Sequence, residues 1–192
     1  GETSQNRQPL DDLISNNGVV QFLRSAGYRF ALIPSSYSAT DHSPIADVCP
    51  CDQTNPTELE NLTLSMSLLS ACPAIREWQY HNHAERILRA FDQIPSQTVE
   101  DGPTFYFSHL LVPHPPFVFG PQGERHAPQT AFTLNDGSHY LGDDYAQRYR
   151  EQITFVNAKV EELIDRILAR RGPEPIIIIQ SDHGPGLELN WS

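Results

Sequence analysis

The longest regular pattern of apolar side chains lies between Asp144 and Arg171. Apolar residues recur there at steps of three and four, the spacing that places them along one face of an α-helix. Gly172 and Pro173 follow directly, and neither residue continues a helix well. The pattern therefore predicts one long helix with a single buried stripe, made up of Tyr145, Tyr149, Ile153, Val156, Val160, Leu163 and Ile167.

Three apolar runs lack this period and predict strands. Tyr28–Ile33 ends at Pro34, Thr104–Val112 is apolar almost throughout, and Pro175–Gln180 contains four consecutive isoleucines. Runs without polar alternation are typical of parallel strands that are buried on both faces. We therefore expect these segments to be neighbouring strands of one mostly parallel sheet.

Further helical patterns occupy Asn17–Ala26, Thr57–Ala71 and Ala74–Gln93, and Pro73 separates the last two. Pro113–Tyr140 is a long loop, and loops of this length in a compact domain are usually functional or disordered. The order strand, helices, strand, helix, strand predicts an α/β fold, a three-layer α/β/α sandwich with a mostly parallel sheet. We expect residues 1–192 to form part of one domain.

Charge and cysteine usage narrow the function classes. The 192 residues carry 24 acidic and 13 basic side chains, a formal net charge of −11, which argues against a nucleic-acid surface. No apolar run approaches the ~18 residues of a membrane span, and no signal peptide is evident. Cys49, Cys51 and Cys72 lack the spacing of a zinc site, so one disulfide or free thiols both stay open.

The sharpest candidate for chemistry is the sequence Ser181-Asp182-His183-Gly184, directly after the isoleucine run. In open parallel sheets, ligands bind beyond the carboxyl ends of the strands. A carboxylate and an imidazole suit zinc or manganese, and glycine lets the backbone turn tightly. The alternative is that Asp182 caps a turn and His183 is a surface residue.

A second candidate is His114, which lies among prolines in Pro113–Phe117 after the second predicted strand. Prolines fix φ and restrict the residue before them, so His114 is expected on a stiff support at the same sheet edge as Asp182. Such a histidine suits an anionic group. The alternative is an incidental histidine in a proline-rich turn.

Other polar residues give weaker signals. Arg125 and His126 lie in the long loop and could contact substrate, although solvated loop charges are the better interpretation. His109 is expected to be a hydrogen-bonded core histidine within the second strand. The remaining candidates are assigned to the surface or to turn chemistry: His81 and His83 to a polar helix face, and Ser35, Ser36, Ser38 and Thr40 to a turn without a base in register.

These residues lead to a family resemblance that covers most of Val19–Gly184. Three segments together resemble the sulfatase branch of the alkaline phosphatase superfamily, above all bacterial membrane-associated sulfatase-domain proteins: FSHLLVPHPPFVFG, YREQITFVNAKVEELIDRIL and IIIIQSDHG. The sequence GYRF at Gly27–Phe30 resembles the family's strand entry, and Asn157 stands where the family helix often carries an Asp. The SDHG sequence is the most specific part.

The resemblance implies a metal site built from an early Asp, a nucleophile and a later Asp-His pair. Asp182 and His183 match the later pair, and His114 matches a substrate-side histidine that stabilises charge on the transferring group. The early Asp and the nucleophile have no match and are expected upstream of Gly1, and a late histidine is expected beyond Ser192. The domain is therefore expected to be incomplete at both ends.

Cys49 does not supply the nucleophile, because formylglycine forms in the sequence Cys-x-Pro-x-Arg. Here Pro50-Cys51-Asp52-Gln53 follows Cys49, which puts both the proline and the arginine out of place.

The expected function is metal-dependent hydrolysis of sulfate or phosphate esters, with zinc, manganese or calcium as cofactor. Two alternatives stay open: transfer of phosphoglycerol or phosphoethanolamine to an envelope glycan or lipid, and a degenerate domain that only binds a metal or ligand. The resemblance implies a parent protein that is anchored in the membrane with this domain outside the cytoplasm. The segment itself is expected to be soluble, to have no nucleic-acid partner and to be inactive alone.

Overall fold

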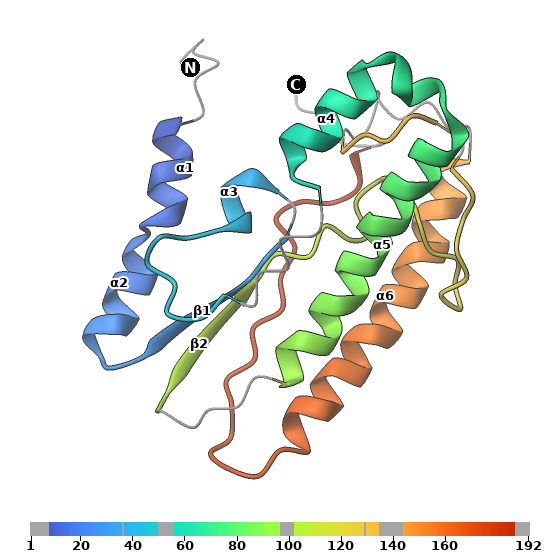
Figure 1. The fold of residues 1–192 in the computed structure, drawn as a ribbon. Helices are drawn as coiled ribbons and strands as arrows, with labels where there is room; N and C mark the ends of the chain where they lie inside the picture. Colours follow the sequence, from blue (N-terminus) through green and yellow to red (C-terminus); the bar gives the residue numbers. More distant parts are fainter. Residues whose placement is uncertain are drawn as a thin grey trace.

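A computed structural model describes residues 8–35, 37–49, 56–96, 102–128, 130–134 and 144–186. Its architecture is mixed α/β and mostly helical (Figure 1). The sheet has two parallel strands, β1 (Arg29–Ile33) and β2 (Thr104–Ser108), paired from Arg29 opposite Thr104 to Ile33 opposite Ser108. The parallel pairing of the first two predicted strands is thereby confirmed.

The β1 strand is the more deeply buried of the two. Its residues from Phe30 to Ile33 are buried, as expected for an apolar run without polar alternation. The edge of β1 away from β2 is covered by the loop at Val48, whose carbonyl accepts a hydrogen bond from the Leu32 amide over 2.9 Å. Since β1 lies between Val48 and β2, its main chain is paired on both sides.

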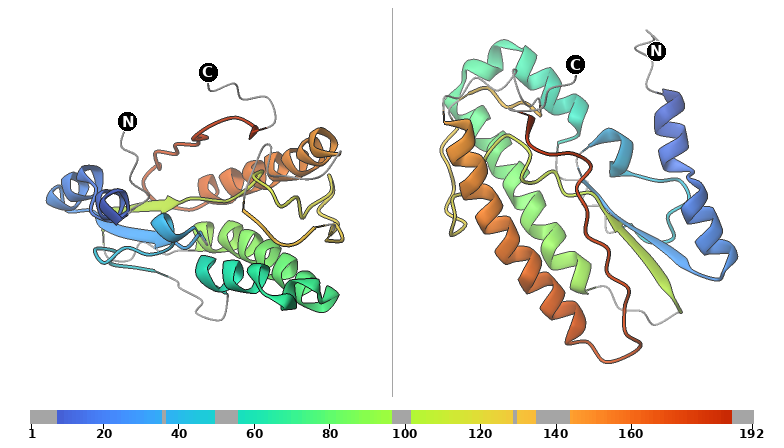
Figure 2. Two further views of the ribbon diagram at one scale, coloured as in Figure 1. Left: turned by 90° about the horizontal axis from the view of Figure 1, so that it is seen from above. Right: turned by 180° about the vertical axis from the view of Figure 1, so that it is seen from behind.

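Two short helices, α1 (Gln8–Ser15) and α2 (Gly18–Ser25), lie on the β1 side of the sheet, where α2 packs on β1 and α1 contacts α3 (Figure 2). The Asn17 side chain caps α2 by accepting a hydrogen bond from the Val20 amide over 3.0 Å. The buried face of α2 forms a small core with β1: Val20, Phe30 and Leu32.

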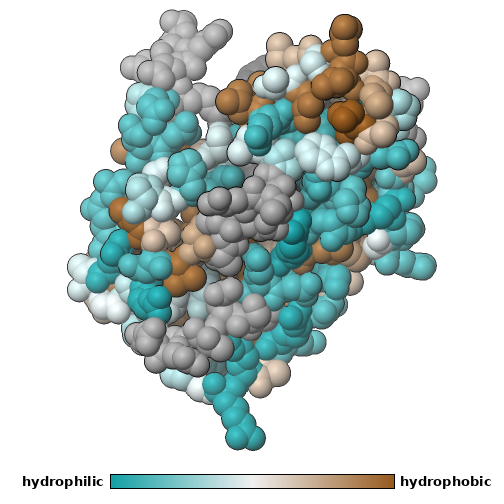
Figure 3. Space-filling view, viewed as in Figure 1, coloured by the Kyte–Doolittle hydropathy of each residue, from teal (hydrophilic) through white to brown (hydrophobic). Residues whose placement is uncertain are grey.

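A second group of elements joins the two strands. After α3 (Ser38–Asp41) comes α4 (Glu58–Met66), whose start is fixed by a capping box between Thr57 and Glu60. Ser67 then adopts an extended conformation and breaks the single helix predicted here into α4 and the 3-10 helix η1 (Leu68–Ala71). Apolar side chains gather over α4 and η1 at the top of the surface in Figure 3, and the exposed ones are Leu59, Leu62, Met66, Leu68 and Leu69.

The main core lies between the two long helices, α5 (Pro73–Ser96) and α6 (Tyr145–Leu168). They lie side by side and run in the same direction (Figures 1 and 2), and Arg166 of α6 pairs with Asp92 of α5 over 3.0 Å. The predicted apolar face of α6 does point toward this core, and the prediction of one long helix is thereby confirmed. The fully packed members of the core are Tyr80, Ala84, Ile87, Phe91, Val118, Phe119, Phe132, Phe155 and Val156.

The prediction of a third strand at Pro175–Gln180 is wrong. The segment is extended and follows the direction of the strands in Figure 1, but it forms no strand. Ile176 is 91% exposed and Ile178 is 79% exposed. A central strand needs ladder hydrogen bonds and a packed layer on each face. Here α5 and α6 pack on each other, and none of the four isoleucines belongs to either core, so the predicted three-layer sandwich is not completed by the described residues.

Among the described residues, no helix combines the length and the apolar character needed to cross a membrane.

Candidate functional site

The carboxyl ends of β1 and β2 place polar side chains at one edge of the sheet. Pro34 and Ser35 follow β1, and His109 follows β2 directly, because that strand ends at Ser108 and not at Val112 as predicted. Parallel strands present their carboxyl ends on the same side, which is where ligands bind in sheets of this kind.

A chain of hydrogen bonds joins the two strand ends. Ser35 Oγ lies 2.9 Å from Thr40 Oγ1, and Thr40 Oγ1 lies 2.9 Å from His109 Nδ1. The ring of Tyr37 packs edge-on against the His109 ring, with centroids 5.8 Å apart. Of the hydroxyls that the sequence assigned to turn chemistry, Thr40 therefore does have a base in register, with Ser35 behind it, and His109 is hydrogen-bonded as expected but only half-buried.

The electrostatics of His109 connect it to the two segments that the sequence singled out. Burial lowers the pKa of His109, the Asp182 carboxylate opposes that shift, and His114 adds to it. Asp182 and His114 come from opposite ends of the second half of the chain, and both act on the same imidazole.

A small cavity of about 10 Å³ lies behind this edge, with space for about one water molecule. Its polar lining includes Ser35, His83, Arg86 and His109. Arg86 forms an ion pair with Asp41 over 3.3 Å, so its charge is already balanced on one side.

His83 is buried in α5, which corrects its assignment to the surface; His81 on the same helix is exposed, as expected. Burial first, then His114 and Arg86, lower the pKa of His83 to about 3. Its Nε2 atom is buried without a hydrogen-bond partner among the described residues. The sequence did carry a signal, because His83 lies four residues before the apolar Ile87 and so shares its helix face.

The His114 segment is held by α6. The side-chain Oε1 of Gln152 accepts hydrogen bonds from the amides of Val118 at 2.7 Å and Phe119 at 3.2 Å, while its Nε2 donates to the His114 carbonyl over 3.2 Å. The His114 ring lies against its own loop, with Nδ1 2.5 Å from the Pro115 carbonyl oxygen. Gln152 was missed in the sequence, although it interrupts the apolar stripe three residues after Tyr149.

Asp182 and His183 lie in an exposed turn after the isoleucine run. The His183 amide donates to Asp182 Oδ1 over 2.9 Å, and His183 Nε2 lies 3.7 Å from Asp182 Oδ2. This is the turn-capping geometry that the sequence left open as the alternative. The described residues contain no group of three His, Cys, Asp or Glu side chains that could hold a metal ion. Asp182 and His183 thus supply two donors, fewer than the three protein ligands of a catalytic zinc site.

Arg125 and His126 have acidic partners on the two long helices. Arg125 pairs with Glu85 of α5 over 2.5 Å and stacks on the Phe119 ring at 4.8 Å, and His126 lies 3.2 Å from Glu151 of α6. These contacts attach the loop to the helices, and they favour the interpretation of both residues as loop charges.

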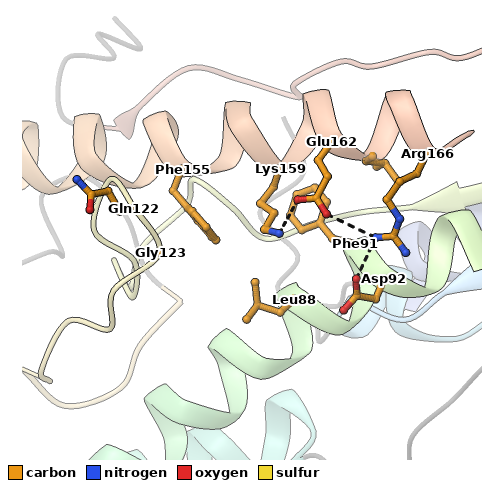
Figure 4. A pocket seen from close by; sticks show the side chains of 10 residues that line it. Leu88, Phe91, Asp92, Gln122, Gly123, Phe155, Lys159, Glu162 and Arg166 are labelled. Carbon is orange, nitrogen blue, oxygen red and sulfur yellow. Dashed lines mark hydrogen bonds and ion pairs between the residues drawn. The ribbon is translucent and has the colours of Figure 1, made fainter. Parts of the chain in front are cut away.

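A second cavity, of about 230 Å³, lies away from this edge, between α5 and α6 (Figure 4). Figure 4 shows Lys159, Glu162, Arg166 and Asp92 forming a chain of ion pairs along it, above apolar side chains. No residue predicted to do chemistry lines this cavity, so we place the candidate site at the sheet edge.

The structure describes only some of the cysteine and serine residues that were considered in the sequence. Cys49 is disulfide-bonded and Cys72 is a free, exposed thiol, whereas Cys51 and Ser36 lie outside the described residues. Ser38 is exposed, and its amide donates a hydrogen bond to Glu58 over 2.8 Å.

No protein-family model matches this chain, and comparisons with curated proteins and with solved structures also gave no match. The family resemblance therefore rests on the sequence segments quoted above.

Proposed function

We propose that this chain supplies one wall of the active site of an enzyme that hydrolyses sulfate or phosphate esters with the help of a divalent metal ion. The observation that carries the proposal is the hydrogen-bonded group of Ser35, Thr40 and His109 at the carboxyl edge of two parallel strands. That edge is the usual ligand site of open α/β sheets, and imidazole groups suit an ester that carries negative charge.

The residues that would hold the metal are Asp182 and His183. A bound divalent ion would polarise an oxygen of the ester and lower the pKa of the nucleophile. Because the described residues offer only two donors there, they do not form a complete metal site, and we assign no step to a metal here. The nucleophile and the further ligands are proposed to belong to the parent protein.

His114 would meet the anionic group of the ester. Its segment is fixed by three hydrogen bonds with the buried Gln152, which accepts two and donates one, so the imidazole is attached to a rigid part of the fold. A preorganised donor stabilises charge that develops in the transition state without a cost of reorganisation at that moment.

A second candidate is a binding domain without catalysis. The observation that favours it is the contact between Asp182 and His183 in an exposed segment, where the His183 amide donates to Asp182 Oδ1 and the two side chains lie 3.7 Å apart. Such a domain would bind an anionic ligand at the sheet edge and would not turn it over.

The decisive experiment compares the parent protein with single variants, using nitrophenyl phosphate and nitrophenyl sulfate with zinc, manganese or calcium. Asp182→Ala and His114→Ala should lower turnover by about a hundredfold or more, the usual cost of removing a catalytic metal ligand or oxyanion donor. Asn157→Ala, on the exposed face of α6, is the matched control and should keep full activity.

Full activity of the Asp182→Ala variant would end the hydrolase proposal. Ligand binding at the sheet edge without turnover in the unmodified parent would favour the binding domain. The 192-residue chain alone is expected to show no turnover above a metal-only control.

A further inference from the structure

We propose that His109 is a second substrate-contacting residue of this site, and that Thr40 and Ser35 hold its ring in the tautomer that carries the proton on Nε2. The inference rests on the proposed function and deepens it, because it names a neutral donor for the anionic sulfate or phosphate group. Thr40 is then a positioning residue, since it acts through His109.

We infer the direction of the hydrogen-bond chain from its distances, because either hydroxyl could donate in the Ser35–Thr40 contact. The Tyr37 amide donates to Ser35 Oγ over 3.0 Å, which occupies an acceptor site of that hydroxyl. Ser35 then has two possible acceptors, Thr40 Oγ1 at 2.9 Å and the Tyr37 carbonyl at 3.3 Å, and the shorter contact is to Thr40.

The distances from the Thr40 hydroxyl to its two possible acceptors can be compared in the same way. The Thr40 hydroxyl has His109 Nδ1 at 2.9 Å and the Tyr37 carbonyl at 3.5 Å, so we assign its proton to the shorter contact, with the imidazole. A histidine whose Nδ1 accepts a hydrogen bond carries its proton on Nε2.

The Nε2–H group is left for a ligand. Nδ1 is satisfied by Thr40, whereas Nε2 has no hydrogen-bond partner among the described residues. The edge-on contact with Tyr37 fixes the ring plane, and burial keeps the imidazole neutral, because its pKa is lowered. A neutral N–H donor can bind an anionic oxygen without being protonated first.

The alternative is a purely structural role, in which Thr40 only provides a hydrogen-bond partner for the half-buried His109 ring. Both hypotheses predict some loss of stability when the Thr40–His109 hydrogen bond is removed, so a stability measurement alone does not distinguish them. They differ in the tautomer, in anion binding and in rescue by a residue that restores only the hydroxyl.

The test uses nitrogen NMR of the histidine rings and titration with inorganic phosphate on the full chain. In the unmodified protein the His109 ring should be in the Nε2–H form, and phosphate should shift its resonances. Thr40→Val should mix the tautomers and weaken phosphate binding by about tenfold, the effect of losing one hydrogen bond to a charged group. Thr40→Ser should restore both the tautomer and the affinity.

His109→Ala should abolish the phosphate response, and His81→Ala, on the exposed face of α5, is the matched control. Urea unfolding of each variant identifies those that remain folded at the temperature of the titration. An Nδ1–H tautomer in the unmodified protein, no phosphate response at His109, or unchanged affinity in a folded His109→Ala variant would each overturn the inference. Activity of the Asp182→Ala parent tests the proposed function separately, so failure of one is distinguishable from failure of the other.

Discussion

The side-chain amide of Gln152 donates a hydrogen bond to the main-chain carbonyl of His114 over 3.2 Å. Its other end accepts from the amides of Val118 and Phe119, and the side chain is fully buried. One polar residue in the apolar stripe of α6 therefore fixes the loop that carries a candidate site residue. The helix and the sheet edge are coupled through this contact.

Removing that amide should destabilise the protein strongly. Gln152→Leu keeps the volume but leaves two buried amides without an acceptor, and each unsatisfied group costs about 1–3 kcal/mol. We expect the free energy of unfolding in urea to fall by roughly 2–5 kcal/mol. Asn157→Leu, on the exposed face of the same helix, should change it by less than about 0.5 kcal/mol. Equal effects of the two variants would show that the Gln152 contacts are not made.

The burial of His83 predicts a dependence of stability on pH. Its folded pKa of about 3 lies below the ordinary value of 6.5, so between these values the unfolded chain binds the proton and the folded chain does not. Stability is therefore complete above pH 6.5 and is lost as the pH falls toward 3, by up to roughly 1.4 kcal/mol per pH unit.

Urea unfolding at several pH values measures this slope. His83→Gln should flatten it, whereas His81→Gln on the same helix should leave it unchanged. A slope that is the same in all three proteins would contradict the burial of His83.

Gly123 is predicted to be intolerant of a side chain for two separable reasons. Its φ is +88°, and an added Cβ would lie 2.6 Å from Phe155 Cε2. Gly27 has nearly the same φ, +87°, with nothing within 4 Å, so Gly27→Ala measures the cost of the backbone conformation alone, about 1 kcal/mol. Gly123→Ala should cost about 1–3 kcal/mol more because the core must shift. Thermal unfolding of both variants gives the comparison, and equal losses would show that Phe155 is not at Gly123.

Ile33 is completely buried, with 0% of its surface exposed, whereas Ile176 is 91% exposed. Ile33→Ala should lower the free energy of unfolding by about 2–5 kcal/mol through lost burial and a cavity. Ile176→Ala should change it by no more than about 0.5 kcal/mol. A large loss in the Ile176 variant, measured by urea unfolding, would mean that the isoleucine segment is packed in solution.

Local patterns in the sequence predicted one long helix and two of the three expected strands. The stripe from Tyr145 to Ile167 identified α6, and the runs at Tyr28–Ile33 and Thr104–Val112 identified both strands, because side-chain periodicity follows directly from backbone geometry. The parallel pairing followed from the helices that connect the two strands.

The sequence predicted that His114 and Asp182 lie at one sheet edge, and this stays a prediction, although both groups influence the pKa of His109. It did not identify the hydroxyl–imidazole chain or the buried His83, because these depend on which face of α5 and which turn of the loop meet in space.

The sequence by itself determined the long helix α6 and the strands β1 and β2, since their patterns depend on residues a few positions apart. The tertiary structure alone decided how the isoleucine segment is placed, which histidine of α5 is buried, and that Thr40 reaches His109. An apolar run in the sequence indicates only that its burial would be favourable, and it does not indicate which segment will cover it. Long-range packing supplies or withholds that partner, and in this protein α5 and α6 pack on each other and leave the isoleucines exposed.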